Sequence, residues 1–328
     1  MRTPLPWIAL LLATAPAQDE PGGARDLADW PHQKPTVPVP KIDGEWWRIA
    51  SNPDLGEFTT AHQQPVDFAI WQAADGSWQL WSCIRGTRCG GQTRLFHRWE
   101  GRSPEQRDWR PRGIAMQADP TLGETAGGLQ APHVFVHDGA WYMVYGDWER
   151  ICLMRSDDGK TFTRVLNERG QPDLFAGPFA NTRDAMVLPI GGLFHCYYTG
   201  LRRETAPHAA VFCRTSHDLA RWSEPIVVSA GGDSAKVSPG ACCECPFVVH
   251  AHDTYYLFRT VGYPDGGVGV QYASPNPLAF GVDDDRCAVG WLRMAAPEIF
   301  QYRRRWYVAA LTPELDGIRV ARLRWDAP

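Results

Sequence analysis

Residues 66–71 (VDFAIW), followed by residues 78–83 (WQLWSC), form the pattern that decides the fold. The first run begins around an ionisable residue, Asp67, and the second run is rich in aromatic residues. Both runs have the length and composition of short β-strands. The same pair recurs along the chain at 132–137 and 141–146, at 183–188 and 194–199, at 244–249 and 255–259, and at 297–302 and 306–311. Self-similarity of this kind predicts a repeat architecture with five units.

A second repeated element supports the same count. A Ser, an Asp or Asn two positions later, and an aromatic residue six positions after the Ser occur three times, at intervals of 60 and 58 residues. The three copies are Ser156, Asp158 and Phe162; Ser216, Asp218 and Trp222; and Ser274, Asn276 and Phe280. Short polar side chains at this spacing bind their own backbone, and we expect the aromatic side chain to be buried beneath the turn. The pattern predicts a turn between the third and fourth strands of a sheet.

Repeats of about 50–65 residues with four strands each are typical of propeller blades. No stretch of ten or more residues shows a clear helical period, which excludes a helical solenoid. The sequence therefore predicts an all-β chain with one five-bladed β-propeller of four-stranded antiparallel blades, spanning residues 44–328. Residues 18–43, rich in Pro, Asp and Gly, are predicted to be an extended lead-in. Residues 45–50 (EWWRIA) are expected to add a strand to the last blade.

The first 17 residues resemble a secretory signal peptide. Arg2 precedes the apolar run at 7–13 (WIALLLA), and residues 15–17 (APA) form a small-x-small cleavage site. A buried N-terminal strand is the alternative. We therefore expect a secreted or periplasmic protein.

Composition excludes several classes of protein. The chain has 328 residues, is 44% hydrophobic and has a formal net charge of −4, which excludes a disordered polypeptide. No apolar run reaches the roughly 18–20 residues of a membrane span, and the weak acidity argues against a nucleic-acid partner. The 15 Trp residues suit carbohydrate binding, because indole rings stack on sugar faces.

The nine cysteines leave at least one thiol outside any intramolecular disulfide. Cys83 and Cys89 flank a short turn and are candidate disulfide partners. Cys242, Cys243 and Cys245 lie close together, but a structural zinc site needs four ligands, usually as two spaced pairs. The sequence leaves the presence of a metal open.

Five ionisable residues lie near the starts of the first strands of the five repeats. They are Asp67, His133, Asp184, Glu244 and Glu298. The inner strands of a propeller line its channel, so these side chains are expected at one mouth. Salt bridges with Arg85, Arg183 and Arg259 are one interpretation. The other is glycosidic bond cleavage, which requires a carboxylic acid and a second carboxylate.

Two motifs resemble those of the five-bladed propellers of glycoside hydrolase families 43 and 32. Residues 183–185 (RDA) are similar to an Arg-Asp-Pro motif, and residues 244–246 (ECP) closely match a Glu-Cys-Pro motif. The resemblance covers roughly residues 64–325. It implies that Asp67 is the base or nucleophile, that Asp184 orients the acid or stabilises the transition state, and that Glu244 is the general acid. We expect Asp184 and enclosure to raise the pKa of Glu244, and Asp67 to stay ionised.

The resemblance further implies an arabinosyl, xylosyl or fructosyl substrate at the end or side chain of an oligo- or polysaccharide. We expect inversion of configuration, because residues 66–68 (VDF) lack the Asn-Asp-Pro-Asn-Gly block of retaining relatives. The candidate substrate-binding residues are His133, Arg183, Glu298, Gln64 and Trp148. No cofactor is expected to be required; a structural calcium ion on the propeller axis would use His133 or Glu298.

Three alternatives remain open. A non-catalytic carbohydrate-binding propeller would use the carboxylates only as hydrogen-bond acceptors. A sialidase-like enzyme requires six blades and a three-arginine clamp, together with a Tyr/Glu nucleophile pair. A phosphorolytic enzyme requires a basic pocket for phosphate.

Overall fold

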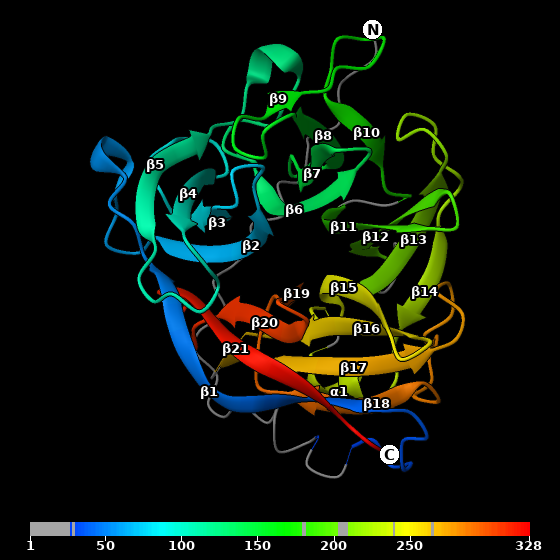
Figure 1. Ribbon diagram of the computed structural model, residues 1–328. Coiled ribbons are helices and arrows are strands. Elements are labelled where there is room, and N and C mark those ends of the chain that lie inside the picture. The colour runs from blue at the N-terminus through cyan, green and yellow to red at the C-terminus, as the bar shows by residue number, and fades with distance from the viewer. Residues whose placement is uncertain (1–26, 28–29, 179–181, 203–208, 239, 264–265) are drawn as a thin grey trace, which may run out of the picture.

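The computed structural model describes residues 27, 30–178, 182–202, 209–238, 240–263 and 266–328. Five antiparallel sheets stand around a central axis and form a five-bladed β-propeller, which confirms the predicted architecture (Figure 1). The inner strands of the blades, β2, β6, β11, β15 and β19, lie nearest the axis. The predicted signal peptide, residues 1–17, lies outside the described residues.

Each blade is named here by its order along the chain, with its strands given from the innermost outward. Blade I contains β2 (Gln64–Gln72), β3 (Trp78–Arg85), β4 (Leu95–Gly101) and β5 (Arg110–Met116). Blade II contains β6 (Gln130–His137), β7 (Ala140–Gly146), β8 (Arg150–Ser156) and β10 (Asp173–Ala176), with β9 (Thr163–Arg164) also paired to β8. Blade III contains β11 (Arg183–Ile190), β12 (Leu193–Leu201), β13 (Ala209–Ser216) and β14 (Ile226–Ala230). Blade IV contains β15 (Glu244–Ala251), β16 (Thr254–Val261), β17 (Val268–Ser274) and β18 (Ala288–Leu292). Blade V contains β19 (Glu298–Tyr302), β20 (Arg305–Leu311), β21 (Gly317–Asp326) and β1 (Val39–Ser51).

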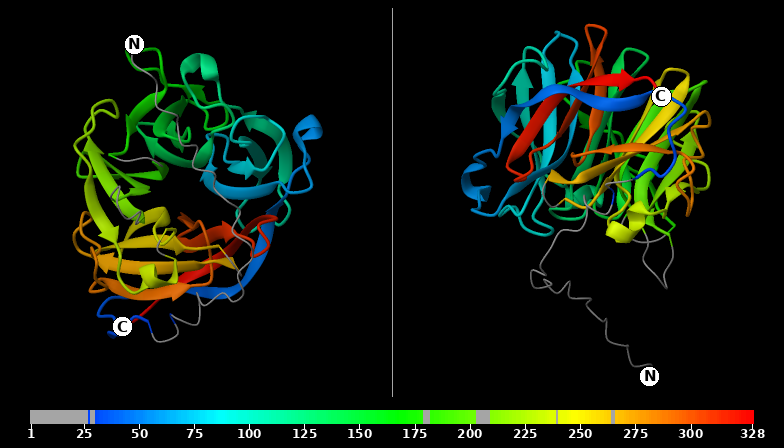
Figure 2. Two further views of the ribbon diagram at one scale, coloured as in Figure 1. Left: turned by 180° about the vertical axis from the view of Figure 1, so that it is seen from behind. Right: turned by 90° about the horizontal axis from the view of Figure 1, so that it is seen from below.

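Blade V joins the two ends of the chain. Strand β1 pairs antiparallel with β21 as the outermost strand, so the blue and red ribbons run side by side in Figures 1 and 2. The added strand was predicted from residues 45–50, and it begins earlier, at Val39. Strand β1 also contacts blade I: the Trp109 amide donates to the Ile49 carbonyl at 2.6 Å, and Trp47 Nε1 donates to the Pro104 carbonyl at 2.9 Å. It therefore links the last blade to the first.

The strands are apolar on both faces because each blade packs against two neighbours. Every residue of β3 from Trp78 to Ile84 is buried. This explains why the aromatic runs of the repeat show little alternation. The predicted polar turns lie between strands as expected: Ser156 Oγ donates to Asp158 Oδ1 at 2.8 Å, and Phe162 packs edge-on against Trp71 and Trp81 of blade I.

Helical structure among the described residues is short. It comprises η1 (Gly56–Phe58), η2 (Pro120–Leu122) and α1 (Ser234–Val237). Within the described ranges, no helix has the length and apolarity required to cross a membrane.

A bulge with left-handed backbone recurs at the start of every inner strand. The residues concerned are Asp67, Ala131, Asp184, Cys245 and Ala296, with φ of 37°, 36°, 56°, 48° and 49°. The strand pairing shifts at this point in blades I to IV. Left-handed φ is uncommon in residues other than glycine, and such strain concentrates at functional sites.

This bulge shows that the five ionisable residues do not occupy equivalent positions. Asp67 and Asp184 lie on the bulge itself, and Glu244 lies one residue before it. His133 and Glu298 lie two residues after it, so they occur further along the inner strands. The predicted single ring is therefore divided into two levels of the channel.

Candidate active site

The three predicted catalytic residues converge on one small cavity. Its volume is about 100 Å³, and it lies between the inner strands of blades I to IV. The lining residues are Val66, Asp67, Arg85, Arg94, Gln130, Arg183, Asp184, Glu244 and Tyr263. Of these, Val66, Gln130, Arg183 and Glu244 each directly precede a bulge residue. The bulge therefore directs the side chains of two successive residues to the same mouth.

Arg183 holds two of the carboxylates. Its Nη2 donates to Glu244 Oε1 at 2.6 Å, and its Nε lies 3.6 Å from Asp184 Oδ2. Burial lowers the pKa of the Arg183 guanidinium, but the charges of Asp184 and Glu244 outweigh burial and raise it above its ordinary value. Arg183 is thus a permanent cation that connects blade III to the Glu244 carboxylate of blade IV.

Cys245 of blade IV forms hydrogen bonds with carboxylates of blades III and I. Its backbone N–H donates to Asp184 Oδ2 at 3.1 Å, and its thiol donates to Asp67 Oδ1 at 3.2 Å. The thiol sulfur also lies 3.3 Å from the Tyr263 hydroxyl. Burial raises the pKa of the Cys245 thiol well above its usual value, and the nearby carboxylates raise it further. The thiol therefore stays protonated and able to donate.

The electrostatics of the cavity differ from the expected assignment. Burial raises the pKa of Asp67, opposed by Arg94 and Cys245, and Glu244 raises it further. Burial also raises the pKa of Asp184 to about 7; Arg183 opposes this, while Asp67 and Glu244 add to it. Two neighbouring carboxylates in an enclosed site resist simultaneous ionisation. The sequence predicted that Asp67 stays ionised, whereas its enclosure raises its pKa and so opposes ionisation.

His133 and Glu298 form the second level of the channel. His133 Nδ1 lies 3.5 Å from Glu298 Oε1. Burial raises the pKa of Glu298, and His133 opposes that rise. Glu298 lines a narrower cavity of about 30 Å³, which Asp67 and Asp184 also line. The pair is thus continuous with the three-carboxylate site.

A calcium ion on the propeller axis would have few protein ligands among the described residues. Within these ranges, no group of three or more His, Cys, Asp or Glu side chains is arranged to hold a metal. Calcium takes about 6–8 oxygen ligands, while the His133–Glu298 pair offers one carboxylate beside an imidazole. Calcium on the axis stays a prediction.

Gln64 and Trp148, predicted to contact substrate, each support an arginine of the cavity. Gln64 Oε1 accepts from Arg85 Nε and Nη2 at 3.0 and 2.7 Å. The Arg94 guanidinium carbon lies 5.0 Å from the centre of the Trp148 ring, a cation–π contact. Neither Gln64 nor Trp148 is among the lining residues of the cavity.

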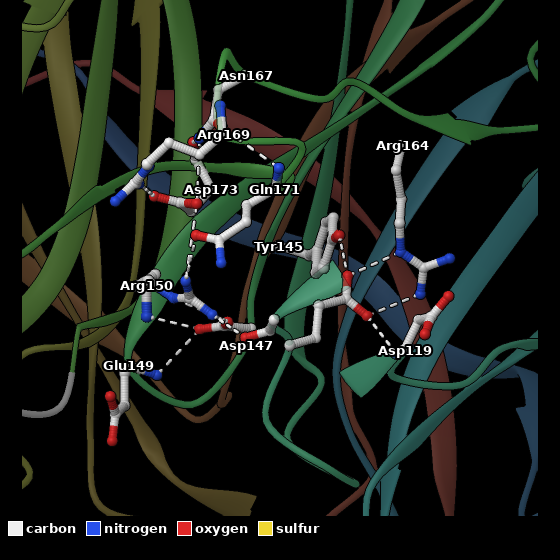
Figure 3. Close-up of polar contacts among 12 residues, drawn as sticks. Asp119, Tyr145, Asp147, Glu149, Arg150, Arg164, Asn167, Arg169, Gln171 and Asp173 are labelled. Carbon is white, nitrogen blue, oxygen red and sulfur yellow. Dashed lines mark hydrogen bonds and ion pairs between the residues drawn. The ribbon is translucent and has the colours of Figure 1, made fainter. Parts of the chain in front are cut away.

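A polar network in blade II fixes the turn that carries Trp148 (Figure 3). Asp147 is fully buried, and its Oδ1 accepts from the backbone N–H groups of Arg150 and Glu149 at 2.8 and 3.2 Å. The Arg150 side chain donates from Nε to Asp147 Oδ2 at 3.0 Å, and its Nη1 lies 3.7 Å from Asp173 Oδ1. Trp148 adopts φ 86°, a strained value for an aromatic residue. The Asp147 carboxylate compensates by accepting from the two backbone amides that follow Trp148.

A second network stands beside it. The carboxylate of Glu124 is fully buried and accepts from Arg164 Nε and Nη2 at 2.8 and 2.8 Å, and also from the Tyr145 hydroxyl. Figure 3 shows Tyr145 and Arg164 near Asp119. The bidentate pair satisfies a charge that would otherwise be costly to bury. It anchors the segment that leads into β6 and Gln130.

Two expectations about arginine and cysteine are corrected. Arg259 does not reach the carboxylates: it is fully buried, with Nη1 2.9 Å from Cys243 Sγ and Nη2 donating to Ser234 Oγ at 2.8 Å. Cys83 and Cys89 are both thiols, and they donate to different carbonyls, those of Leu129 and Arg94. The side chains face different partners, so the candidate disulfide is absent.

Arg85 was predicted in the channel as a salt-bridge partner, and it lines the cavity; three further lining residues, Arg94, Gln130 and Tyr263, were missed by sequence reasoning. Gln130 had a weak signal, because it lies two positions before the second repeat, which starts at residue 132. Arg85 ends β3 and Arg94 directly precedes β4, so both lie beside the mouth of blade I. Gln130 is buried, and its Oε1 has no hydrogen-bond partner among the described residues.

Comparison with solved structures supports the fold. No protein-family model matches the sequence, and no curated protein sequence is detectably similar to it. The structure is similar to a thermostable family-43 glycoside hydrolase, with TM-score 0.58 and 16% identity over 81% of this chain and 90% of that one. It is also similar to a GH43_1 enzyme from Xanthomonas citri complexed with xylose (TM-score 0.58, 14% identity, 84% and 90%). An endo-1,4-beta-xylanase from Bacteroides thetaiotaomicron gives TM-score 0.60 and 13% identity over 81% and 95%. These similarities establish a shared five-bladed propeller.

Proposed function

We propose that this chain is a glycoside hydrolase that cleaves a terminal or side-chain sugar from an oligo- or polysaccharide. The observation that carries the proposal is the convergence of Asp67, Asp184 and Glu244, from three different blades, on one cavity. Arg183 and Cys245 connect these carboxylates directly. The fold neighbours include a beta-xylosidase, a xylanase and an exo-1,5-alpha-L-arabinanase, which supports a pentosyl substrate.

Exposure favours Glu244 as the general acid. Its side chain is 16% exposed, against 4% for the side chain of Asp184. The leaving group departs toward solvent, so the acid that protonates its oxygen belongs at the open edge of the site. Asp67, which is buried and lines the same cavity, is assigned the role of base or nucleophile. Asp184 orients the acid through Arg183, which contacts both residues.

We further propose inversion of configuration at the anomeric carbon. An inverting enzyme places a water between its two carboxyl groups, which lie about 6.5–9.5 Å apart, whereas retention requires about 5–5.5 Å. Proton NMR of the first-formed anomer tests this directly. Accumulation of the anomer with retained configuration would assign Asp67 as nucleophile instead.

The decisive experiment is an activity screen on aryl xylosides, arabinofuranosides and fructosides and on plant polysaccharides. Native protein should release sugar, and Glu244→Gln should lose turnover while still binding the same sugar. Glu168→Gln, an exposed glutamate in blade II, is the matched control. Folded native protein that binds sugars without turnover, with Glu244→Gln binding unchanged, would support the carbohydrate-binding alternative instead. The count of five blades weighs against the sialidase-like alternative.

Export through a signal peptide at residues 1–17 is part of the proposal. Expression with the native N-terminus should yield a mature chain beginning at Gln18. N-terminal sequencing of the extracellular or periplasmic product measures this.

A further inference from the structure

The cavity contains more positive charge than the proposed hydrolysis requires. Three arginines line it, and Arg183 is committed to Glu244 and Asp184. Arg85 and Arg94 both come from blade I and both act electrostatically on Asp67. Within the described ranges, neither forms an ion pair with a carboxylate. Among the described residues, these two guanidinium groups of the 100 Å³ cavity therefore have no carboxylate within ion-pair distance.

The two side chains are held in place by neutral partners. Gln64 accepts two hydrogen bonds from one edge of Arg85, which leaves the other N–H groups of this guanidinium available. Arg94 lies over the Trp148 ring, and the Asp147–Arg150 network fixes the turn that carries this ring. A ring face and an amide oxygen orient an arginine without neutralising it. Both arginines are thus positioned in advance while keeping their charge.

The carboxylates on the other side do not cancel this charge. The Asp67 and Asp184 carboxyls are enclosed and adjacent, and their pKa values are raised, by burial above all. The cavity therefore contains three guanidinium groups facing two adjacent carboxyls that oppose simultaneous ionisation. An excess of positive charge in an enclosed site attracts anions.

We propose that Arg85 and Arg94 form an oxyanion subsite beside Asp67, so that the natural substrate is an acidic glycoside whose sugar carries a carboxylate or a sulfate ester. This inference rests on the proposed hydrolase activity and assigns it an acidic sugar in place of the neutral pentosyl substrate that the fold neighbours support. Guanidinium groups bind such planar or tetrahedral oxyanions through paired N–H donors. Free phosphate has the same chemistry. As an attacking group it would break the glycosidic C–O bond and form a C1–O–P bond, while Glu244 protonates the leaving oxygen.

Calorimetric binding measurements on matched sugars test the subsite. Glucuronate and glucose, galacturonate and galactose, and mannuronate and mannose differ only in the group on C5, and inorganic sulfate and phosphate probe the anion alone. We expect at least one uronate to bind about tenfold or more tightly than its neutral partner. The preference should fall in Arg85→Gln and Arg94→Gln, recover partly in Arg94→Lys, and be unchanged in Arg88→Gln, an exposed arginine of the same blade.

Turnover assays distinguish an anion carried by the substrate from free phosphate. They also test the oxyanion subsite and the hydrolase activity separately. Cleavage of an aryl uronide or a sulfated glycoside assigns the anion to the substrate, whereas phosphate-dependent release of a sugar phosphate assigns it to phosphate. Cleavage of neutral glycosides with no preference for any uronate or inorganic anion would overturn the subsite and leave the hydrolase standing. Anion binding that depends on Arg85 and Arg94, without cleavage of any glycoside, would support the subsite and overturn the hydrolase.

Discussion

The thiol of Cys245 lies 3.2 Å from Oδ1 of Asp67, and the two residues come from blades on different parts of the chain, I and IV. The same residue donates its backbone N–H to Asp184 at 3.1 Å. One cysteine thus fixes the separation of two carboxylates that are 117 positions apart in sequence (184 − 67). Its left-handed backbone, φ 48°, is what allows the N–H and the thiol to face different carboxylates.

Replacing this thiol should shift the pH dependence of activity. The Cys245 hydrogen bond lowers the pKa of Asp67, against the rise caused by burial. Cys245→Ala removes the donor, so Asp67 would ionise at a higher pH, and the acidic limb of kcat/KM against pH should move upward. Cys245→Ser retains a donor and should stay close to native. An acidic limb at the same pH in the native protein and both variants would show that ionisation of Asp67 does not control this limb.

Glu244→Gln should reduce activity on polysaccharide by about 10²–10⁴-fold, the usual contribution of a general acid. The loss should be much smaller on aryl glycosides whose phenol leaves readily, because such leaving groups need no protonation. Measuring kcat/KM across phenols of graded pKa checks this. If the loss were independent of the phenol, Glu244 would act on another step, and the same series on Asp184→Asn would then identify Asp184 as the acid.

Asp184→Asn should stabilise the protein more at high pH than at low pH. The carboxyl has an ordinary pKa of 3.8, and burial raises it to about 7 in the folded state. Between these values the folded state binds the proton and the unfolded state does not, so stability falls as pH rises from about 4 to about 7. Asn cannot ionise, and it tolerates the left-handed φ of 56°.

Thermal unfolding of native protein and Asp184→Asn at pH 4.5 and pH 8 measures this difference. The Tm of the variant relative to native should be higher at pH 8. The Arg183 contact is stronger when Asp184 is ionised, but the pKa of about 7 already includes this attraction, so the expected sign of the difference is unchanged. A constant difference in Tm would contradict the raised pKa.

The repeat count could be predicted from the second strand of each blade. Both faces of this strand are buried, so it appears in the sequence as a continuous apolar and aromatic run such as 78–83. The Ser156–Phe162 turn was predictable for a local reason: its bonds are formed within a few residues. Strand β1 was anticipated from its Trp-rich segment, but its start at Val39 depends on pairing with β21, nearly 300 positions away.

The site was less predictable, because its geometry depends on one backbone bulge. The sequence predicted His133 and Glu244 at one mouth of the channel, whereas the bulge at Ala131 and Cys245 separates them into two levels. Arg94 reaches the cavity through the chain's approach to blade II, where its amide donates to the Gly127 carbonyl. No local pattern marks that contact. The fold was thus encoded locally, while the charge balance of the cavity was set by tertiary packing.

Removal of divalent metal should leave activity unchanged. In the described residues, the His133–Glu298 pair lacks a third protein donor, and the proposed chemistry uses carboxylates and arginines alone. Activity and Tm after dialysis against EDTA, with calcium added back as the control, measure the effect. A loss restored by calcium but not by magnesium would establish a cation on the axis instead.

Ile49→Ala should destabilise the whole propeller, because Ile49 lies where the ring closes. The side chain is fully buried in the core shared by blades V and I, and its carbonyl accepts the Trp109 amide. Truncating a buried isoleucine costs about 2–5 kcal/mol in the free energy of unfolding. Glu45→Ala, on an exposed position of the same strand, should cost little. Chemical denaturation measures both. Because blades I and V share this strand, Ile49→Ala should lower the denaturant concentration at the midpoint of one unfolding transition of the whole ring. A separate transition at lower denaturant, confined to part of the protein, would show instead that ring closure does not couple the blades.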